Sequence, residues 1–109
     1  MNNKPSDIAV VGDKDSVLAF KSIGMDARPV SDEYAAAGEI RKLAENGTKV
    51  IYITEQFAEL ISDTIDKYKT KPYPIIIPIP YSRGSNGFGM KNLKKDVEKA
   101  IGADILFNK

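Results

Sequence analysis

Two short, unbroken runs of apolar residues constrain the fold of this chain more than any other feature. Ile8–Val11 is closed by Gly12, and Val50–Ile53 is followed by Thr54. Runs of this kind are typical of strands that are buried on both faces, and such strands occur mainly in parallel sheets covered by helices on each side. The sequence therefore predicts an α/β protein with these two strands at the centre of its sheet.

Helix and turn signals follow the first central strand. Asp13 to Ser16 supply side chains that begin helices, and Gly24 is placed to end the first helix in a left-handed conformation. Residues 27–30 form a weak second strand, which we expect at an edge because Pro29 has no N–H to donate to a ladder. Ser31 or Asp32 can cap a second helix, which Asn46-Gly47 ends. The inward-facing residues predicted for these two helices are Val17, Phe20, Ile23, Ala36, Ile40, Leu43 and Ala44.

A third helix and a fourth strand complete the pattern. Thr54 is predicted to cap the third helix, and Pro74–Pro80 reads as an edge strand whose prolines turn their missing N–H groups away from the ladder. The inner stripe predicted for this helix is Phe57, Leu60, Ile61, Ile65 and Tyr68. The order βαβαβαβ predicts a small open parallel sheet with strand order 2-1-3-4, the winding of flavodoxin-like and receiver-like proteins, and helices on both faces.

Residues 1–80 are predicted to form this sheet domain, and residues 81–109 a hinge, a mobile helix and a tail. Ser82–Gly89 contains three glycines, and an amphipathic helix ended by Gly102 follows it. The apolar stripe of that helix can pack on the sheet or on a partner, and the apolar tail beyond Gly102 favours a partner. The predicted partner interface comprises Phe88, Met90, Leu93, Val97, Ile101, Ile105 and Leu106. The alternative contact lies on the third helix, around Gln56, Glu59 and Asp63.

Composition argues against several classes of function. The 109 residues include no His, Cys or Trp, so the usual general base, thiol nucleophile and soft-metal ligands are missing, and we expect a non-enzyme without a cofactor or metal. No apolar run approaches the roughly 18 residues of a membrane span, so no direct membrane insertion is expected. Residues 1–66 carry 7 basic and 12 acidic side chains, whereas residues 67–109 carry 9 and 3. The basic residues Lys91, Lys94, Lys95 and Lys99 fall on the solvent side of the last helix without an aromatic platform, so no nucleic acid is expected.

The crevice where the winding of the sheet reverses is the place for a ligand in such a fold. Asp13, Asp15 and Glu55 line it and could form the Mg²⁺ pocket of a receiver-like signalling domain, but Thr54 or Glu55 stands where the phosphoacceptor Asp should be. A flavin or nucleotide carrier is a further alternative, although two carboxylates would repel a phosphate here. The favoured interpretation is that Asp13, Asp15, Ser16, Thr54 and Glu55 are structural caps of helix N-termini.

Four segments together resemble the F subunit of the bacterial and archaeal V-type (A/V-type) rotary ATPases, a component of their central stalk. They are Gly12-Asp-Lys-Asp-Ser-Val-Leu-Ala-Phe-Lys-Ser-Ile-Gly24, Val50–Glu55, Pro74–Pro80, and the ending formed by Gly87–Leu93 with Val97–Leu106. The resemblance covers roughly residues 6–106.

The resemblance implies a non-catalytic rotor subunit with an α/β domain and a mobile C-terminal part. Such a subunit binds the coiled-coil shaft, which is the D subunit of the same ATPase. Through the rotor it connects with the A/B catalytic hexamer and with the socket subunit of the membrane sector. It contributes to the coupling of ATP hydrolysis or synthesis to ion transport. The resemblance also implies a cytoplasmic protein that is peripheral on the membrane through the ATPase complex.

Overall fold

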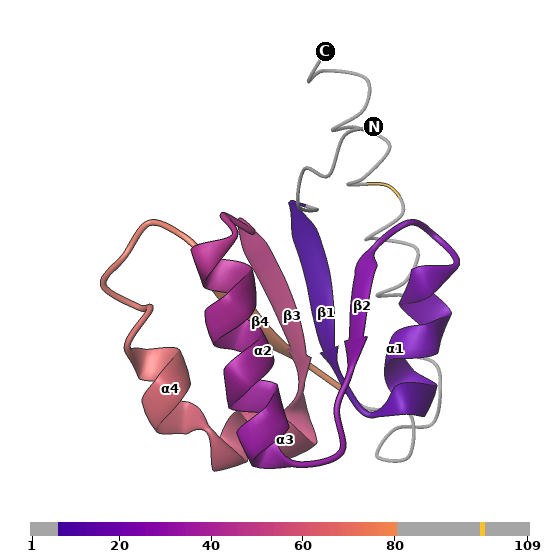
Figure 1. Cartoon of the computed structure of the whole chain (residues 1–109), viewed down its shortest axis with the longest axis horizontal. Helices are drawn as coiled ribbons and strands as arrows, with labels where there is room; N and C mark the ends of the chain where they lie inside the picture. The colour runs from indigo at the N-terminus through magenta and orange to yellow at the C-terminus, as the bar shows by residue number, and fades with distance from the viewer. Residues whose placement is uncertain (1–6, 81–98, 100–109) are drawn as a thin grey trace.

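The computed structural model describes residues 7–80 and Lys99, and it contains the predicted α/β fold (Figure 1). Four parallel strands, β1 (Ile8–Gly12), β2 (Asp26–Pro29), β3 (Val50–Thr54) and β4 (Ile75–Ile79), form one sheet in the order β2-β1-β3-β4. The predicted strand order 2-1-3-4 is therefore confirmed. Val10 pairs with Ala27 on one side and with Tyr52 on the other, which places β1 and β3 at the centre.

Two apolar cores lie on opposite faces of the sheet. Ala9, Val11, Ile51 and Ile53 point to one face, where helices α2 (Glu33–Glu45) and α3 (Glu55–Leu60) pack over them. Val10 points to the other face, which is covered by α1 (Lys14–Lys21). Figure 1 shows α1 apart from the other helices, across the sheet. The central strands are thus buried on both sides, as their continuous apolar runs predict.

The first two helices begin and end where their capping residues predict. Asp13 accepts a hydrogen bond from the N–H of Ser16, and Asp32 accepts one from the N–H of Ala35. Gly24 and Gly47 follow the two helices with φ of 92° and 88°, a left-handed conformation that costs other residues free energy. Of the predicted inner residues, Val17, Phe20, Ala36, Ile40 and Leu43 are buried, whereas Ile23 and Ala44 are half-buried.

The third helix is not the single capped helix that the sequence predicts. It is divided into α3 and α4 (Ser62–Asp66) at Ile61, whose backbone leaves the helical region with φ −117° and ψ 30°. The division keeps Ile61 buried but leaves Leu60 61% exposed, so the prediction that Leu60 faces inward is wrong. Thr54 does stand at the N-cap position of α3, but its side chain makes no capping hydrogen bond, which corrects the predicted cap. Its hydroxyl is instead buried in the core.

Strand β4 forms an edge of the sheet within the described part of the chain. The N–H of Ile75 donates to the carbonyl of Lys49, the residue before β3, at 2.8 Å. The backbone nitrogens of a strand alternate in direction, so those of residues 74, 76 and 78 point away from β3. Two of these positions are prolines, as predicted, so Ile76 alone of the three offers an N–H at the outer edge.

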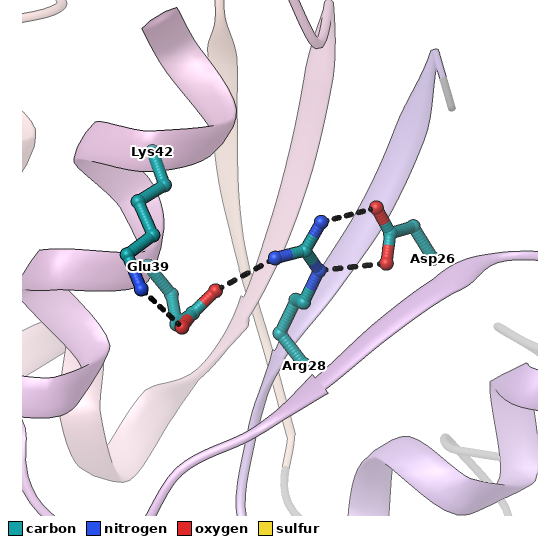
Figure 2. Close-up of polar contacts among 4 residues, drawn as sticks. All are labelled: Asp26, Arg28, Glu39 and Lys42. Carbon is teal, nitrogen blue, oxygen red and sulfur yellow. Dashed lines mark hydrogen bonds and ion pairs between the residues drawn. The ribbon is translucent and has the colours of Figure 1, made fainter. Parts of the chain in front are cut away.

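The opposite edge strand, β2, is held to α2 by a network of ion pairs (Figure 2). Arg28 donates from Nε and Nη2 to the two carboxylate oxygens of Asp26 at 2.7 and 2.8 Å, and from Nη1 to Glu39 at 3.0 Å. Glu39 also lies 3.7 Å from the ammonium of Lys42. The hydrogen bonds with Asp26, supported by its charge and by Glu39, raise the pKa of Arg28 above its usual value in spite of partial burial. The network therefore joins an edge strand of only four residues to the longest helix of the described chain.

Candidate functional site

The crevice at the C-terminal ends of β1 and β3 is organised around Asp13. One carboxylate oxygen of Asp13 accepts hydrogen bonds from the hydroxyl of Ser16 at 2.7 Å and from the amide of Gln56 at 3.2 Å. The other oxygen accepts the N–H of Ser16 at 3.2 Å. Because Gln56 lies in the first turn of α3, Asp13 connects the starts of two helices through a contact that spans 43 residues of the chain. Both oxygens of this carboxylate are thus engaged in structural contacts.

The other acids expected at this crevice are not brought together. Asp15 and Glu55 are exposed, and each lies in the first turn of its own helix, where a carboxylate stabilises the positive end of the helix dipole. Thr54 is fully buried, and its hydroxyl has no hydrogen-bond partner within the described residues. Among residues 7–80 and Lys99, no group of three or more acidic side chains converges as metal ligands would. Gln56 completes the crevice, and no local sequence signal indicates its bond to Asp13.

A groove between α3, α4 and β4 is a second candidate site. It has a volume of about 530 Å³. Its apolar residues are Ala58, Ile65, Ile76 and Pro78, and its polar residues are Glu55, Glu59, Ser62, Asp66 and Lys69. A smaller hollow of about 190 Å³ shares Ile65, Lys69 and Ile76 with it and continues along β4 to Pro74. The two hollows together follow the outer edge of the sheet.

The helices that flank this groove carry a one-sided charge. Residues 55–66 include four acids, Glu55, Glu59, Asp63 and Asp66, and no basic residue. Lys69 approaches within 3.0 Å of Asp66, and this is the only ion pair that the described part of the chain places at the groove. Leu60, which is exposed where α3 ends, borders an adjoining hollow together with Glu55, Gln56 and Glu59. The groove thus combines an apolar floor with an acidic rim.

The predicted interface in the C-terminal segment lies outside the described residues. Phe88, Met90, Leu93, Val97, Ile101, Ile105 and Leu106 are all among these positions, as are the predicted hinge and tail. Lys99 is described, and it is helical and exposed, as expected for the solvent side of the predicted helix.

Comparison with known proteins identifies the family. The sequence pattern of one family, the ATP synthase (F/14-kDa) subunit, matches residues 8–97, from the start of β1 to a position within the predicted C-terminal helix. The chain belongs to this family. The resemblance seen in the sequence motifs is therefore confirmed.

Similar members of this ATP synthase family occur in bacteria and archaea. The chain is 46% identical to the V-type ATP synthase F subunit of Clostridium perfringens and 44% identical to that of Clostridium botulinum, in each case over 99 residues. These matches cover 91% of this chain and 94% and 96% of the relatives. It is 32% identical over 105 residues to the A-type ATP synthase F subunit of Thermococcus onnurineus, covering 90% of this chain and 96% of that protein. The likeness extends over nearly the whole length of each relative.

Proposed function

We propose that this chain is a non-catalytic central-stalk subunit of a V-type ATPase or ATP synthase. The observation that carries the proposal is the match, over about nine-tenths of the chain, to relatives named as the F subunit of V-type ATP synthases. In this proposal the chain binds the coiled-coil shaft, the D subunit of the same complex, and turns with it. Through the rotor it connects the A/B catalytic hexamer with the socket subunit of the membrane sector. It is cytoplasmic and peripheral on the membrane, and within the described residues no helix has the length and apolar character of a membrane span.

A mechanical role agrees with how the crevice residues are used. Asp13 engages both carboxylate oxygens with Ser16 and Gln56, so it holds the starts of α1 and α3 together. β3 ends in a buried threonine, where a receiver-like domain would need an accessible carboxylate. The chain would then contribute to coupling through its contacts with the rotor, while ATP chemistry takes place on other subunits.

Co-expression with the shaft subunit encoded by the same genome tests this function. We expect the two chains to elute as one complex in size-exclusion chromatography. Elution of this chain alone would contradict the proposal, and a flavin absorbance band or phosphorylation by a small phosphodonor would favour the rival classes.

The predicted C-terminal interface is tested in the same assay. Replacing Leu93 and Val97 with Ala should weaken binding to the shaft by about 2–5 kcal/mol if these side chains are buried against it. The sheet domain should remain folded, as judged by its circular dichroism. A variant that binds as tightly as the original chain would remove this stripe from the interface.

A further inference from the structure

The open groove between α3, α4 and β4 has the form of a docking surface. Its residues are different from those of the predicted interface in the C-terminal segment. Its floor is formed on the β4 side by Ile76 and Pro78, and on the helix side by Ala58 and Ile65. Together with the hollow that continues to Pro74, it extends along the sheet edge from position 74 to position 78. Five residues of strand span about 16 Å, which is the length of about three turns of an α-helix.

The edge of β4 favours a helix over a strand as the occupant. A partner strand would need N–H groups along the outer edge of β4, and the prolines at positions 74 and 78 remove two of the three that point outward. Side chains packed into an apolar floor do not need these groups. The groove therefore suits the apolar ridge of an amphipathic helix.

The rim of the groove specifies the charge of that helix. Glu55 and Glu59 stand four residues apart on α3, and like charges at this spacing repel each other along a helix surface. No basic residue lies in the last turn of α3, whereas the end of α4 has Lys67 at its C-cap and Lys69 paired with Asp66. Cationic side chains of a partner would relieve the repulsion between Glu55 and Glu59 and would complement the C-terminal end of α3.

From these features we infer that the groove binds a partner helix whose apolar ridge is flanked by Lys or Arg. This inference rests on the proposed function, in which the partner is the coiled-coil shaft, and it assigns the shaft a second contact on the sheet domain. The exposed Leu60, which lies beside the acidic rim, extends the apolar contact beyond the groove.

Three variants of the full-length chain, each co-purified with the shaft subunit, test the inference. Glu59→Lys reverses a rim charge, and Ser62→Trp fills the groove from an exposed position on α4. Glu45→Lys is the matched control, because Glu45 is exposed at the end of α2 and lines none of these hollows. We expect the first two to weaken shaft binding by about tenfold or more and the control to change it by less than about twofold. High salt should reduce the difference between Glu59→Lys and the original chain, since it screens the charges.

The outcomes distinguish a failure of the groove inference from a failure of the proposed function. If the original chain binds the shaft and both groove variants bind equally well, the inference is wrong and the proposed function stands. If the original chain does not bind the shaft, both fall. Measurements on the isolated variants, without the shaft subunit, test two other occupants of the groove. A loss of stability in Glu59→Lys that Glu45→Lys lacks would assign the groove to residues 81–109 of this chain, and a change from dimer to monomer would assign it to a second copy. Either result would overturn the inference.

Discussion

Gly12→Ala offers the sharpest test of how β1 and β3 meet at the crevice. A methyl group at position 12 would lie 2.4 Å from Cγ2 and 2.7 Å from Oγ1 of Thr54, far inside ordinary contact distance. Thr54 is β-branched and fully buried, so a change of its χ1 rotamer is restricted. Relief therefore requires the two central strands to separate by about 1 Å, and overpacking of this kind costs about 1–3 kcal/mol of the free energy of unfolding.

Thr54→Ala should remove most of that cost. It deletes the two nearest atoms and leaves Cβ, at 3.1 Å, as the closest remaining neighbour. Alone, it should cost about 1 kcal/mol for the lost methyl group, because the buried hydroxyl has no partner within the described residues to lose. In the Thr54→Ala background, Gly12→Ala should then cost less than about 1 kcal/mol, which gives a coupling energy of about 1–2 kcal/mol.

Urea unfolding of the four chains, followed by circular dichroism, measures this cycle. Gly38→Ala is the control, because the nearest atom to its new methyl group is Nη2 of Arg41 at 4.0 Å and the position lies inside α2. It should stabilise the chain by about 0.5–1 kcal/mol. Equal costs of Gly12→Ala in both backgrounds would refute the reasoning, since the contact with Thr54 would then not be the cause.

Three further substitutions test local features of the fold. Asp13→Ala should lower the free energy of unfolding by about 0.5–2 kcal/mol, because the starts of α1 and α3 lose hydrogen bonds. A purely structural role would be contradicted if calorimetry showed that the original chain binds Mg²⁺ more tightly than millimolar and that the variant does not. Arg28→Met keeps the apolar stem but removes the partner of Asp26 and Glu39. It should lower the free energy of unfolding by about 1–2 kcal/mol at low salt and by less at high salt. A loss of stability that does not depend on salt would exclude the ion pairs as its source. Gly24→Ala should lower the free energy of unfolding by about 1 kcal/mol, because φ at this position is 92° and alanine disfavours that conformation. No steric clash contributes, since no atom lies within 4 Å of the new methyl group. Unchanged stability in thermal unfolding would show that the turn adapts.

Local patterns predicted most of the sheet domain because each reports the environment of its own residues. The continuous apolar runs at positions 8–11 and 50–53 indicated central strands, and Pro29 indicated an edge. Asp13 and Asp32 cap the helices that they precede. These features depend on residues within one or two helical turns of each other, so the chain order and spacing suffice to find them.

Helical periodicity alone did not place every side chain of the third helix. The spacing of Phe57, Leu60 and Ile61 is compatible with one amphipathic helix, yet the helix divides at Ile61 and exposes Leu60. The sequence pattern identifies the apolar residues of a helix. The packing of that helix on the sheet determines which of them are buried. In this chain the sheet covers Ile61 and leaves Leu60 at the surface.

What the sequence alone determined is the four strands, the first two helices, their order along the chain and the winding that follows from them. The tertiary structure decided the contacts between distant residues: Gln56 with Asp13, Gly12 against Thr54, and Arg28 between Asp26 and Glu39. It also decided that three acids of α3 and α4, Glu55, Glu59 and Asp66, border an apolar groove beside the edge strand β4. The reason is physical, because such contacts depend on strand register and on the packing of helices over the sheet, and neither is encoded in any single stretch of sequence.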